Sequence, residues 1–324
     1  MVLFSIACEI LAGVNSMTVP VTEEANDVYR GLDRWQSDRI LWAIVAAQTK
    51  AVASICDAVP ALALAGEQAA DRMRQGGRLI YAGAGSSGLL AQVDALELPG
   101  TYGIEPESVP VLLAGGDAAL LAIPSEAEDD AAEARQSVER LNVGPLDILV
   151  AVSASGRTPY TLAALTAAKQ RGALTIGIAC NAATPMLLAA DHAVLLATPP
   201  EVVAGSTRMN AGTAQKCALN MLSTLIGIRL GHVYDGMMVN VRAENDKLRQ
   251  RAARMVAQAC DLSEDAAAKL LDTAGGEVKT AIVLHHLPAG TLAGARAMLE
   301  AHSGDVRSAL EAITAQAAGR QSSA

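Results

Sequence analysis

Aromatic and basic residues are scarce in this chain. Only 2% of its 324 residues are aromatic, with a single Phe, and the formal net charge is −9 with a pI near 5.1. Proteins that bind nucleic acids place clustered Lys and Arg on the phosphates and often stack aromatic side chains on the bases. The composition therefore argues against a nucleic-acid partner.

Cysteine is infrequent, and no cysteine spacing is typical of a metal site. The five cysteines are odd in number and contain no Cys-x-x-Cys pair, so neither a disulfide framework nor a zinc site is predicted. The pair His285-His286 lacks matching ligands nearby, so we expect a structural role for it and no metal. A reducing, cytoplasmic location fits this cysteine usage. The cysteines are Cys8, Cys56, Cys180, Cys217 and Cys260.

A secretory leader and a long uncharged apolar run are also missing. Residues 1–16 are apolar, but they lack a basic start and contain Glu9, so they do not predict a signal peptide. No later apolar run is long and uncharged enough to predict a transmembrane helix, and no membrane partner is expected. We expect residues 1–16 to be a disordered or wrongly assigned extension.

What the chain does contain is a regular alternation of apolar strand patterns with helical patterns. This alternation, from about Arg78 to Thr198, predicts an α/β fold with a parallel sheet covered by helices on both faces. The predicted strands are 79–82, 109–113, 148–152, 175–180 and 193–196. A packing helix is expected within 33–74, a long apolar-faced helix over 212–230, and a charged helix over 240–258.

The remaining sequence predicts a small helical unit. Short helical patterns within 262–313 are separated by Gly275-Gly276, Pro288-Ala289-Gly290 and Ser303-Gly304, which indicates a compact three-helix appendage. The predicted domains are an N-terminal extension (1–32), a large α/β domain with flanking helices (33–255) and a small helical domain (256–318).

Two loops rich in glycine and hydroxyl groups carry the strongest functional signal. We call the GAGSSG segment 83–88 the first serine loop and the SASGRT segment 153–158 the second serine loop. Each follows a predicted buried strand and opens a helix, where backbone amides, hydroxyls and the helix dipole favour an anion. The sequence therefore predicts a phosphorylated ligand at the carboxyl ends of the strands.

Two other interpretations of the first serine loop stay open at this point. Gly83, Gly85 and Gly88 have the spacing of a dinucleotide-binding fingerprint, and Asp117 follows the next predicted strand, where such a site needs an acid for the ribose. Adjacent hydroxyls in the loop and a second similar loop favour a phosphomonoester over a pyrophosphate. Both loops also fit ordinary tight turns between strand and helix.

Longer motifs resemble the N-acetylmuramic acid 6-phosphate etherases, members of the sugar isomerase (SIS) domain superfamily, from about Thr22 to the chain's end. This resemblance implies a SIS-type parallel sheet between helices and a small ubiquitin-associated-like C-terminal domain, here including GGEVKTAIV (275–283). The motifs are GRLIY (77–81) before the first serine loop, DALELP (94–99), AVSASGRTPY (151–160), EVVAGSTRMNAGTAQK (201–216) and LNMLST (219–224).

The chain departs from the family pattern at three places. Leu89 follows the first serine loop where the family usually has Arg, and Ser125 replaces the first glutamate of the family's acidic turn. The motif around Thr22-Glu23 and Asn26 is only partly kept. A related phosphosugar substrate therefore stays open.

The resemblance also implies a reaction and a catalytic pair. N-acetylmuramic acid 6-phosphate would lose its D-lactyl ether to give N-acetylglucosamine 6-phosphate and D-lactate, without a metal or redox cofactor. Glu97 matches the family's acid, which protonates departing lactate, and Glu128 matches the base at C2, with Glu126 as the alternative. Apolar neighbours make Glu97 the better candidate for a raised pKa.

The remaining predicted site residues surround the phosphate and the sugar. Arg157 could equally be solvated, Ser206 and Thr207 could equally cap a helix, and Lys216 could equally form a surface ion pair. The predicted binding residues are Ser86, Ser87, Gly88, Ser153, Ser155, Gly156, Arg157, Thr158, Ser206, Thr207 and Lys216. The amides of Gly88 and Gly156 are expected to assist the hydroxyls.

Other activities of similar proteins provide the alternatives. An aldose-ketose phosphosugar isomerase would use the same loops and one base, and a non-catalytic phosphosugar sensor would not need both glutamates. The two glutamates together favour the etherase. By the same resemblance we expect a homodimer whose subunits complete each other's sites. The source of the sugar, recycled cell wall or uptake, stays open.

Overall fold

A five-stranded parallel sheet forms the centre of the large domain. The computed structural model describes residues 19–122, 125–241, 246–288 and 290–321, so the expectation for residues 1–16 lies outside the described residues. The strand order is β2-β1-β3-β4-β5, and the predicted parallel sheet is confirmed. The strands are β1 (Leu79–Gly83), β2 (Val111–Leu113), β3 (Ile148–Val152), β4 (Leu174–Ala179) and β5 (His192–Leu195).

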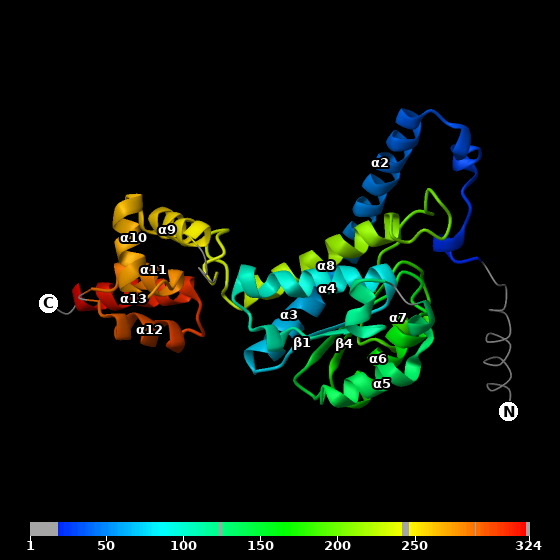
Figure 1. The fold of residues 1–324 in the computed structure, drawn as a ribbon. Helices are drawn as coiled ribbons and strands as arrows, with labels where there is room; N and C mark the ends of the chain where they lie inside the picture. Colours follow the sequence, from blue (N-terminus) through cyan, green and yellow to red (C-terminus); the bar gives the residue numbers. More distant parts are fainter. Residues whose placement is uncertain (1–18, 123–124, 242–245, 289, 322–324) are drawn as a thin grey trace, which may run out of the picture.

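Helices cover both faces of this sheet (Figure 1). Alternate strand residues point to opposite faces: Tyr81 and Val150 join the core under α3, α4 and α8, whereas Ile80 and Leu149 join the core under α5, α6 and α7. The helices are α2 (Ser37–Ala53), α3 (Val59–Arg74), α4 (Gly85–Tyr102), α5 (Ala131–Arg140), α6 (Pro159–Gln170), α7 (Pro185–Ala189) and α8 (Asn210–Arg229). Short 3₁₀ turns are η1 (Val21–Glu23), η2 (Asp27–Tyr29), η3 (Leu32–Arg34), η4 (Ser54–Ala58), η5 (Pro106–Ser108), η6 (Gly116–Leu120) and η7 (Ser125–Asp129).

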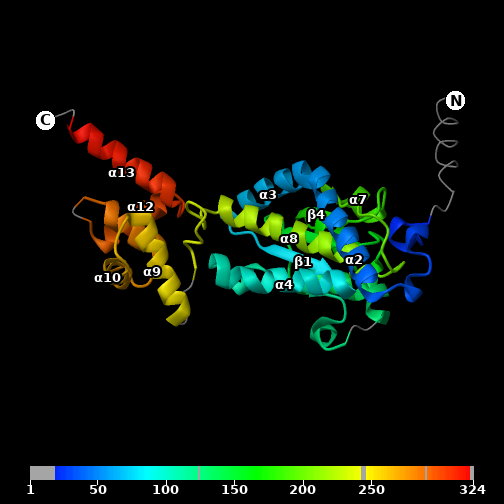
Figure 2. The ribbon, with the colours of Figure 1, turned by 90° about the horizontal axis from the view of Figure 1, so that it is seen from above.

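Helix α2 projects from the large domain in Figure 1, and Figure 2 shows the same helix from above. Several apolar side chains of this helix are not covered by the chain. Leu41, Trp42 and Val45 are exposed, with Trp42 at 70%. The expected packing helix is therefore packed only in part within one chain. The helical stretch 37–74 is long and apolar enough to cross a membrane by length and composition. Its second half, α3, instead buries Leu62 and neighbouring alanines in the core against the sheet.

The small helical domain is larger than the sequence predicts. Its core joins residues of α9 to α13 with Val239 and Val241, so the unit begins before residue 256 and contains more than three helices. Residues 240 and 241 precede α9 without being helical, contrary to the predicted helix from 240. The helices are α9 (Asp246–Cys260), α10 (Glu264–Thr273), α11 (Val278–His286), α12 (Leu292–Ala301) and α13 (Val306–Gln321).

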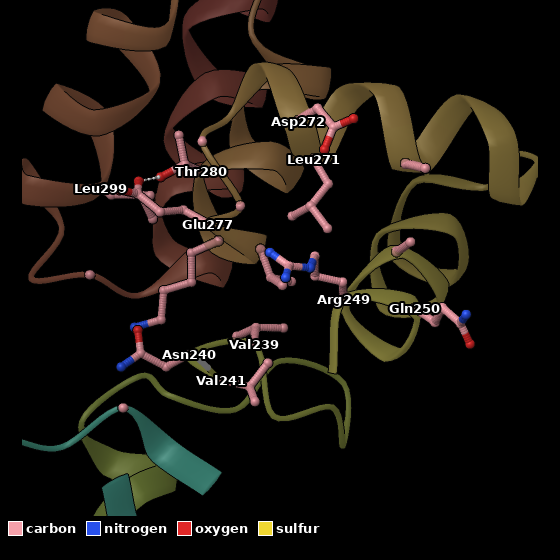
Figure 3. Close-up of a pocket in the computed structure, with 18 residues that line it drawn as sticks. Val239, Asn240, Val241, Arg249, Gln250, Leu271, Asp272, Glu277, Thr280 and Leu299 are labelled. Carbon is pink, nitrogen blue, oxygen red and sulfur yellow. Dashed lines mark hydrogen bonds between the residues drawn. The ribbon is translucent and has the colours of Figure 1, made fainter. Parts of the chain in front are cut away.

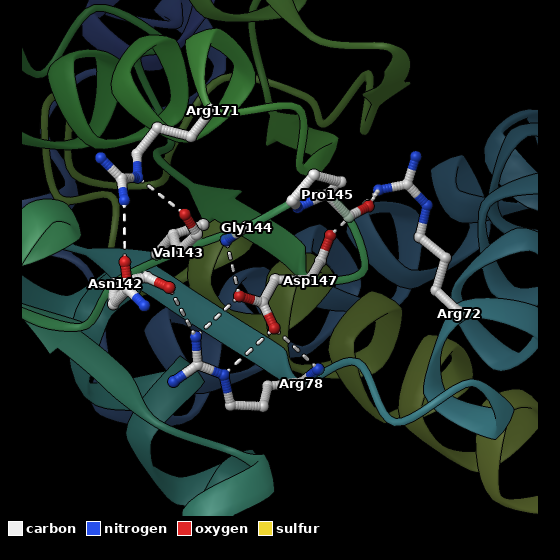
Figure 4. A network of polar contacts seen from close by, with 8 residues as sticks. All are labelled: Arg72, Arg78, Asn142, Val143, Gly144, Pro145, Asp147 and Arg171. Atoms are coloured by element: carbon white, nitrogen blue, oxygen red, sulfur yellow. Dashed lines mark hydrogen bonds and ion pairs between the residues drawn. The ribbon is translucent and has the colours of Figure 1, made fainter.

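An ion pair between Arg78 and Asp147 joins the starts of β1 and β3 (Figure 4). These starts lie at the edge of the sheet opposite the serine loops. The Arg78 guanidinium donates to both carboxylate oxygens of Asp147, at 3.1 and 2.7 Å. The amides of Arg78 and Gly144 donate to the same carboxylate at 3.0 and 2.9 Å. Burial would raise the pKa of Asp147, but these hydrogen bonds and the Arg78 charge outweigh it and lower the pKa.

We expect Asp147→Asn to lower the free energy of unfolding at neutral pH by about 2 kcal/mol, because charged hydrogen bonds are lost at a mostly buried site. Since the folded-state pKa is lowered, this contribution is present above the unfolded pKa of about 3.9 and disappears as the pH falls through the folded value. Urea unfolding of both proteins at pH 7 and at decreasing pH measures it. A stability difference that does not shrink at low pH contradicts the assignment.

Candidate active site

The two serine loops lie next to each other at the carboxyl edge of the sheet. Their strands β1 and β3 are neighbours, with Gly83 paired to Val152. The chain leaves β1 through α4 on one face and β3 through α6 on the other, so the loops flank the point where the strand order reverses. Crevices at such points are the usual ligand sites of open parallel sheets.

Close packing requires glycine in the first serine loop. A Cβ on Gly88 would lie 2.5 Å from Leu113 Cδ1 and 2.8 Å from the carbonyl carbon of Gly83. Helix α4 therefore starts directly against β1, and the amides of Gly85, Ser86 and Ser87 in its first turn have no intrahelical acceptor. The Gly88 amide, a predicted phosphate donor, instead donates to Ala84 O at 3.0 Å.

The two hydroxyls of the first serine loop differ in their surroundings. Ser86 is half-buried, and its hydroxyl forms no hydrogen bond with any described residue. Ser87 is buried and donates to Gln215 Oε1 on α8 at 2.9 Å. Gln215 is itself buried, and its Nε2 has no partner among the described residues. The sequence did not single out Gln215, although it belongs to the 201–216 motif, and it ties Ser87 to α8.

The second serine loop brings three predicted hydroxyls together. Ser153 Oγ lies 3.2 Å from Ser155 Oγ and 2.8 Å from Thr158 Oγ1. The Gly156 amide donates to Ser153 Oγ at 3.1 Å, so this predicted phosphate donor is engaged within the loop. Gly156 has a φ of 64°, and a Cβ there would lie 2.4 Å from Thr184 Oγ1, so glycine is required. Arg157 is exposed.

Glu128 lies over the first serine loop. A Cβ built on Gly85 would be 2.7 Å from Glu128 Oε1, which places this half-buried carboxylate at the amino terminus of α4. Glu126, the alternative residue, is exposed on the same turn η7. The structure therefore brings Glu128, rather than Glu126, to the first serine loop.

Glu97 does not lie beside Glu128 in the same chain. It is exposed on α4, 12 residues beyond Gly85, which at roughly 1.5 Å per residue is about 18 Å along the helix. Leu96 is exposed beside it. The burial expected from the apolar neighbours of Glu97 is not provided within one chain.

The 201–216 motif leads into α8 and contacts the first serine loop through Gln215. Buried Glu201 accepts hydrogen bonds from the amides of Asn210 and Ala211, at 2.8 and 2.9 Å, where α8 begins. Burial raises the pKa of Glu201, while these two amide bonds oppose the rise. Because Glu201 caps α8, Ser206 and Thr207 are not its caps, and both are half-buried on the preceding turn.

The amino-terminal segment links the 201–216 motif to the second serine loop. Buried Thr22 accepts a hydrogen bond at its Oγ1 from Asn181 Nδ2 at 3.1 Å, and its carbonyl accepts from the Gly205 amide. Asn181 Nδ2 also donates to Ala154 O of the second serine loop. Thr22 and Asn181 thus join three segments that are distant in sequence. Lys216 is exposed on α8, and no described residue forms an ion pair with it.

No group of three or more His, Cys, Asp or Glu side chains is arranged to hold a metal within the described ranges. The rings of His285 and His286 contact each other edge to face, and His286 Nδ1 lies 2.9 Å from Ile282 O. Both belong to α11 in the small domain, away from the serine loops (Figure 1).

The sheet order and paired loops define a SIS domain, and the SIS domain family profile matches residues 47–180. The chain belongs, more narrowly, to the N-acetylmuramic acid 6-phosphate etherase family. It is 44% identical to the N-acetylmuramic acid 6-phosphate etherase of Deinococcus radiodurans over 289 residues, 89% of this chain and 94% of that protein. The protein of the same name from Rubrobacter xylanophilus is 42% identical, covering 90% of this chain and 95% of its own length.

Solved structures with similar folds include two phosphoheptose isomerases. The protein from Francisella tularensis aligns with a TM-score of 0.44 at 20% identity, covering 60% of this chain and 98% of its own. The protein from Neisseria gonorrhoeae gives a TM-score of 0.41 at 21% identity, covering 59% and 98%.

Proposed function

We propose that this protein cleaves the D-lactyl ether of N-acetylmuramic acid 6-phosphate, giving N-acetylglucosamine 6-phosphate and D-lactate. The observation that supports it best is the Glu128 carboxylate over Gly85, between two hydroxyl-rich loops at the switch point of the sheet. The loops would bind the phosphate through Ser86, Ser153, Ser155 and Thr158. Family membership supports the choice of substrate.

The chemistry needs one base and one acid. In the ring-opened sugar the C1 aldehyde acidifies the C2 proton, and Glu128 would remove it. The C3–O bond then breaks, and lactate leaves with a proton from Glu97. Water then adds across the C2–C3 double bond, with its hydroxyl going to C3 and a proton going to C2. This addition returns both glutamates to their starting protonation states. Each step is a proton transfer or a carbon-oxygen bond change, so the reaction is that of a carbon-oxygen lyase followed by hydration.

We further propose that the site is shared between two subunits. About 18 Å along α4 separates Glu97 from Gly85, so the two glutamates of one chain do not reach the same sugar carbons. A homodimer in which α4 of one subunit passes the serine loops of the other would bring Glu97 to Glu128. The uncovered apolar face of α2, with Leu41, Trp42 and Val45 exposed, supports such an association.

The cytoplasm is the proposed location. Free thiols persist under reducing conditions, and the cysteines within the described residues, Cys56, Cys180, Cys217 and Cys260, are all free.

Purified protein should release D-lactate from N-acetylmuramic acid 6-phosphate, and Glu128→Gln should lower kcat by at least about 100-fold, because a general base is lost. Binding of the sugar phosphate should be retained, since the serine loops are unchanged. Glu126→Gln, on the same turn but exposed, is the matched control and should keep near-parental activity.

Two outcomes would contradict the proposal, and each would indicate a different function. Sugar-phosphate binding by the parent without any lactate release would indicate a phosphosugar sensor. Formation of a product of equal mass, again without lactate, would indicate an aldose-ketose isomerase.

A further inference from the structure

A large cavity separates the small helical domain from the end of the large domain (Figure 3). Its volume is about 960 Å³, within the usual range of small-molecule sites. It is lined by Gly103 at the end of α4, by Asn240 and its neighbours, and by α9, α10 and α11 of the small domain. Gly103 lies 18 residues beyond Gly85, about 27 Å along α4, so this cavity is separate from the serine loops of its chain.

Lys279 gives the cavity a cation that has no partner within the part of the chain that the structure describes. This lysine is in the first turn of α11, within the GGEVKTAIV motif, and it lines the cavity as a half-buried side chain. Its ammonium forms no hydrogen bond or ion pair with any residue in the described ranges. Burial lowers the pKa of Lys279 to about 8, and the opposing effect of Asp305 is too weak to restore it.

Two carboxylates near Lys279, those of Asp305 and Glu277, are engaged elsewhere, and a third, Asp272, lines the cavity as an exposed side chain. Asp305 accepts a hydrogen bond from the Ser308 amide at 2.7 Å. Glu277 is bound to Thr280 Oγ1 at 2.7 Å and to Arg296 at 2.9 Å. Burial, and secondarily the Lys279 charge, lowers the pKa of His232 to about 3, so this imidazole is neutral. Among the described residues, none forms a hydrogen bond or an ion pair with the ammonium, and Asp305 acts on it only at longer range.

The rest of the lining combines charged groups of both signs with apolar side chains, which suits a small ligand that has both a charged and an apolar part. Arg249 adds a second cation, a guanidinium, to the wall, and the backbone amides that begin α11 lack a side-chain cap. Apolar side chains such as Val239, Leu271 and Leu299 complete the cavity. Asn240 donates its Nδ2 to Tyr102 O at 2.6 Å, which fixes the wall contributed by the large domain.

We propose that this cavity is a second ligand site, which binds a small organic anion, a carboxylate or a phosphate, with the Lys279 ammonium as its counter-ion. The site is built from the small domain and the end of α4, and it does not depend on the reaction proposed for the serine loops.

The test is a ¹³C NMR titration of the full-length protein labelled at lysine Cε. The chain has only six lysines, so the signals can be assigned with single variants. Inorganic phosphate or D-lactate is added at constant ionic strength, with chloride as the reference anion. A bound anion near the ammonium should raise the pKa of Lys279 from about 8 by about one unit or more, because an opposite charge favours the protonated amine. The anion that raises the pKa of Lys279 identifies the chemical class of the ligand.

Lys269, exposed on α10 outside the cavity, is the internal control and should not respond. Calorimetry should show that Lys279→Met binds the anion at least tenfold more weakly than the parent. Lys269→Met and Lys279→Arg should keep the parental affinity for it. An unchanged Lys279 titration at anion concentrations that saturate the serine loops overturns the proposal. An equal shift at Lys279 and Lys269 also overturns it, because that is nonspecific screening.

Discussion

A mixture of Glu97→Ala and Glu128→Ala subunits should recover about a quarter of the parental lactate release, although each variant alone is inactive. Loss of either carboxylate removes an acid or a base, which costs about 10²- to 10⁴-fold in rate. In a mixed dimer, one subunit keeps Glu128 and the other keeps Glu97. If the two carboxylates of a site come from different subunits, one of the two sites in each mixed dimer is intact.

The expected quarter follows from random association. Half of the dimers are mixed and each has one working site of two, provided that subunits exchange freely. Co-expression with two affinity tags, or refolding of an equimolar mixture, supplies the mixed dimers, and initial rates of lactate release measure the recovery. The structural reason is the separation of Glu97 from the loop that Glu128 covers, about 18 Å along α4.

A matched control uses the double variant Glu97→Ala/Glu128→Ala mixed with Glu128→Ala. No site in that mixture has both carboxylates, so no activity should return. Absence of recovery in the main mixture, with mixed dimers verified by both tags, would mean that each site uses glutamates of a single chain. A parental protein that is active as a monomer would likewise contradict the shared site.

The sheet was predictable because its signals are local. Runs such as 148–152 are continuously apolar, since parallel strands between two helical layers are buried on both faces. The placement of the serine loops followed from the same pattern, because the carboxyl ends of parallel strands meet at one edge. Strand boundaries agree within two residues, and the largest difference is at β2, which begins at Val111 rather than at residue 109.

Long-range contacts account for what the sequence did not predict. Ser206 and Thr207 have the residue types of a helix cap, yet Glu201 caps α8 from several residues upstream. The sequence predicts Ser87 as a phosphate ligand. In the structure its hydroxyl donates a hydrogen bond to Gln215, 128 residues away. A local pattern does not identify partners that only folding brings together.

Helix α2 and the small domain illustrate a second limit. Periodicity shows that a helix has an apolar face, but it does not show whether that face is covered by the same chain, and on α2 Trp42 remains exposed. Likewise, the predicted domain boundary after residue 255 placed most of α9 with the large domain. Its buried residues Ala252 and Val256 instead pack into the core of the small domain.

Asp94 joins three elements through a buried network that holds α4 in place. Its carboxylate accepts hydrogen bonds from Tyr81 OH on β1 at 2.7 Å, and from Asn220 Nδ2 and Ser223 Oγ on α8 at 2.6 and 3.1 Å. Burial, and then the Asp94 charge and hydrogen bond, raises the pKa of Tyr81 well above its ordinary value, so the phenol stays a donor. Glu97 lies one turn further along the same helix.

We expect Asp94→Ala to lower the free energy of unfolding by about 3–5 kcal/mol, because two buried donors and one half-buried donor lose their acceptor at once. This is a large part of the roughly 5–15 kcal/mol that stabilises a typical domain. Urea unfolding followed by circular dichroism measures it. Asp71→Ala is the matched control: Asp71 pairs with Arg74 on the exposed surface of α3, and its loss should cost less than about 1 kcal/mol. Equal shifts of the urea midpoint in the two variants would show that the Asp94 network contributes no more than a surface ion pair, and that other contacts position Glu97.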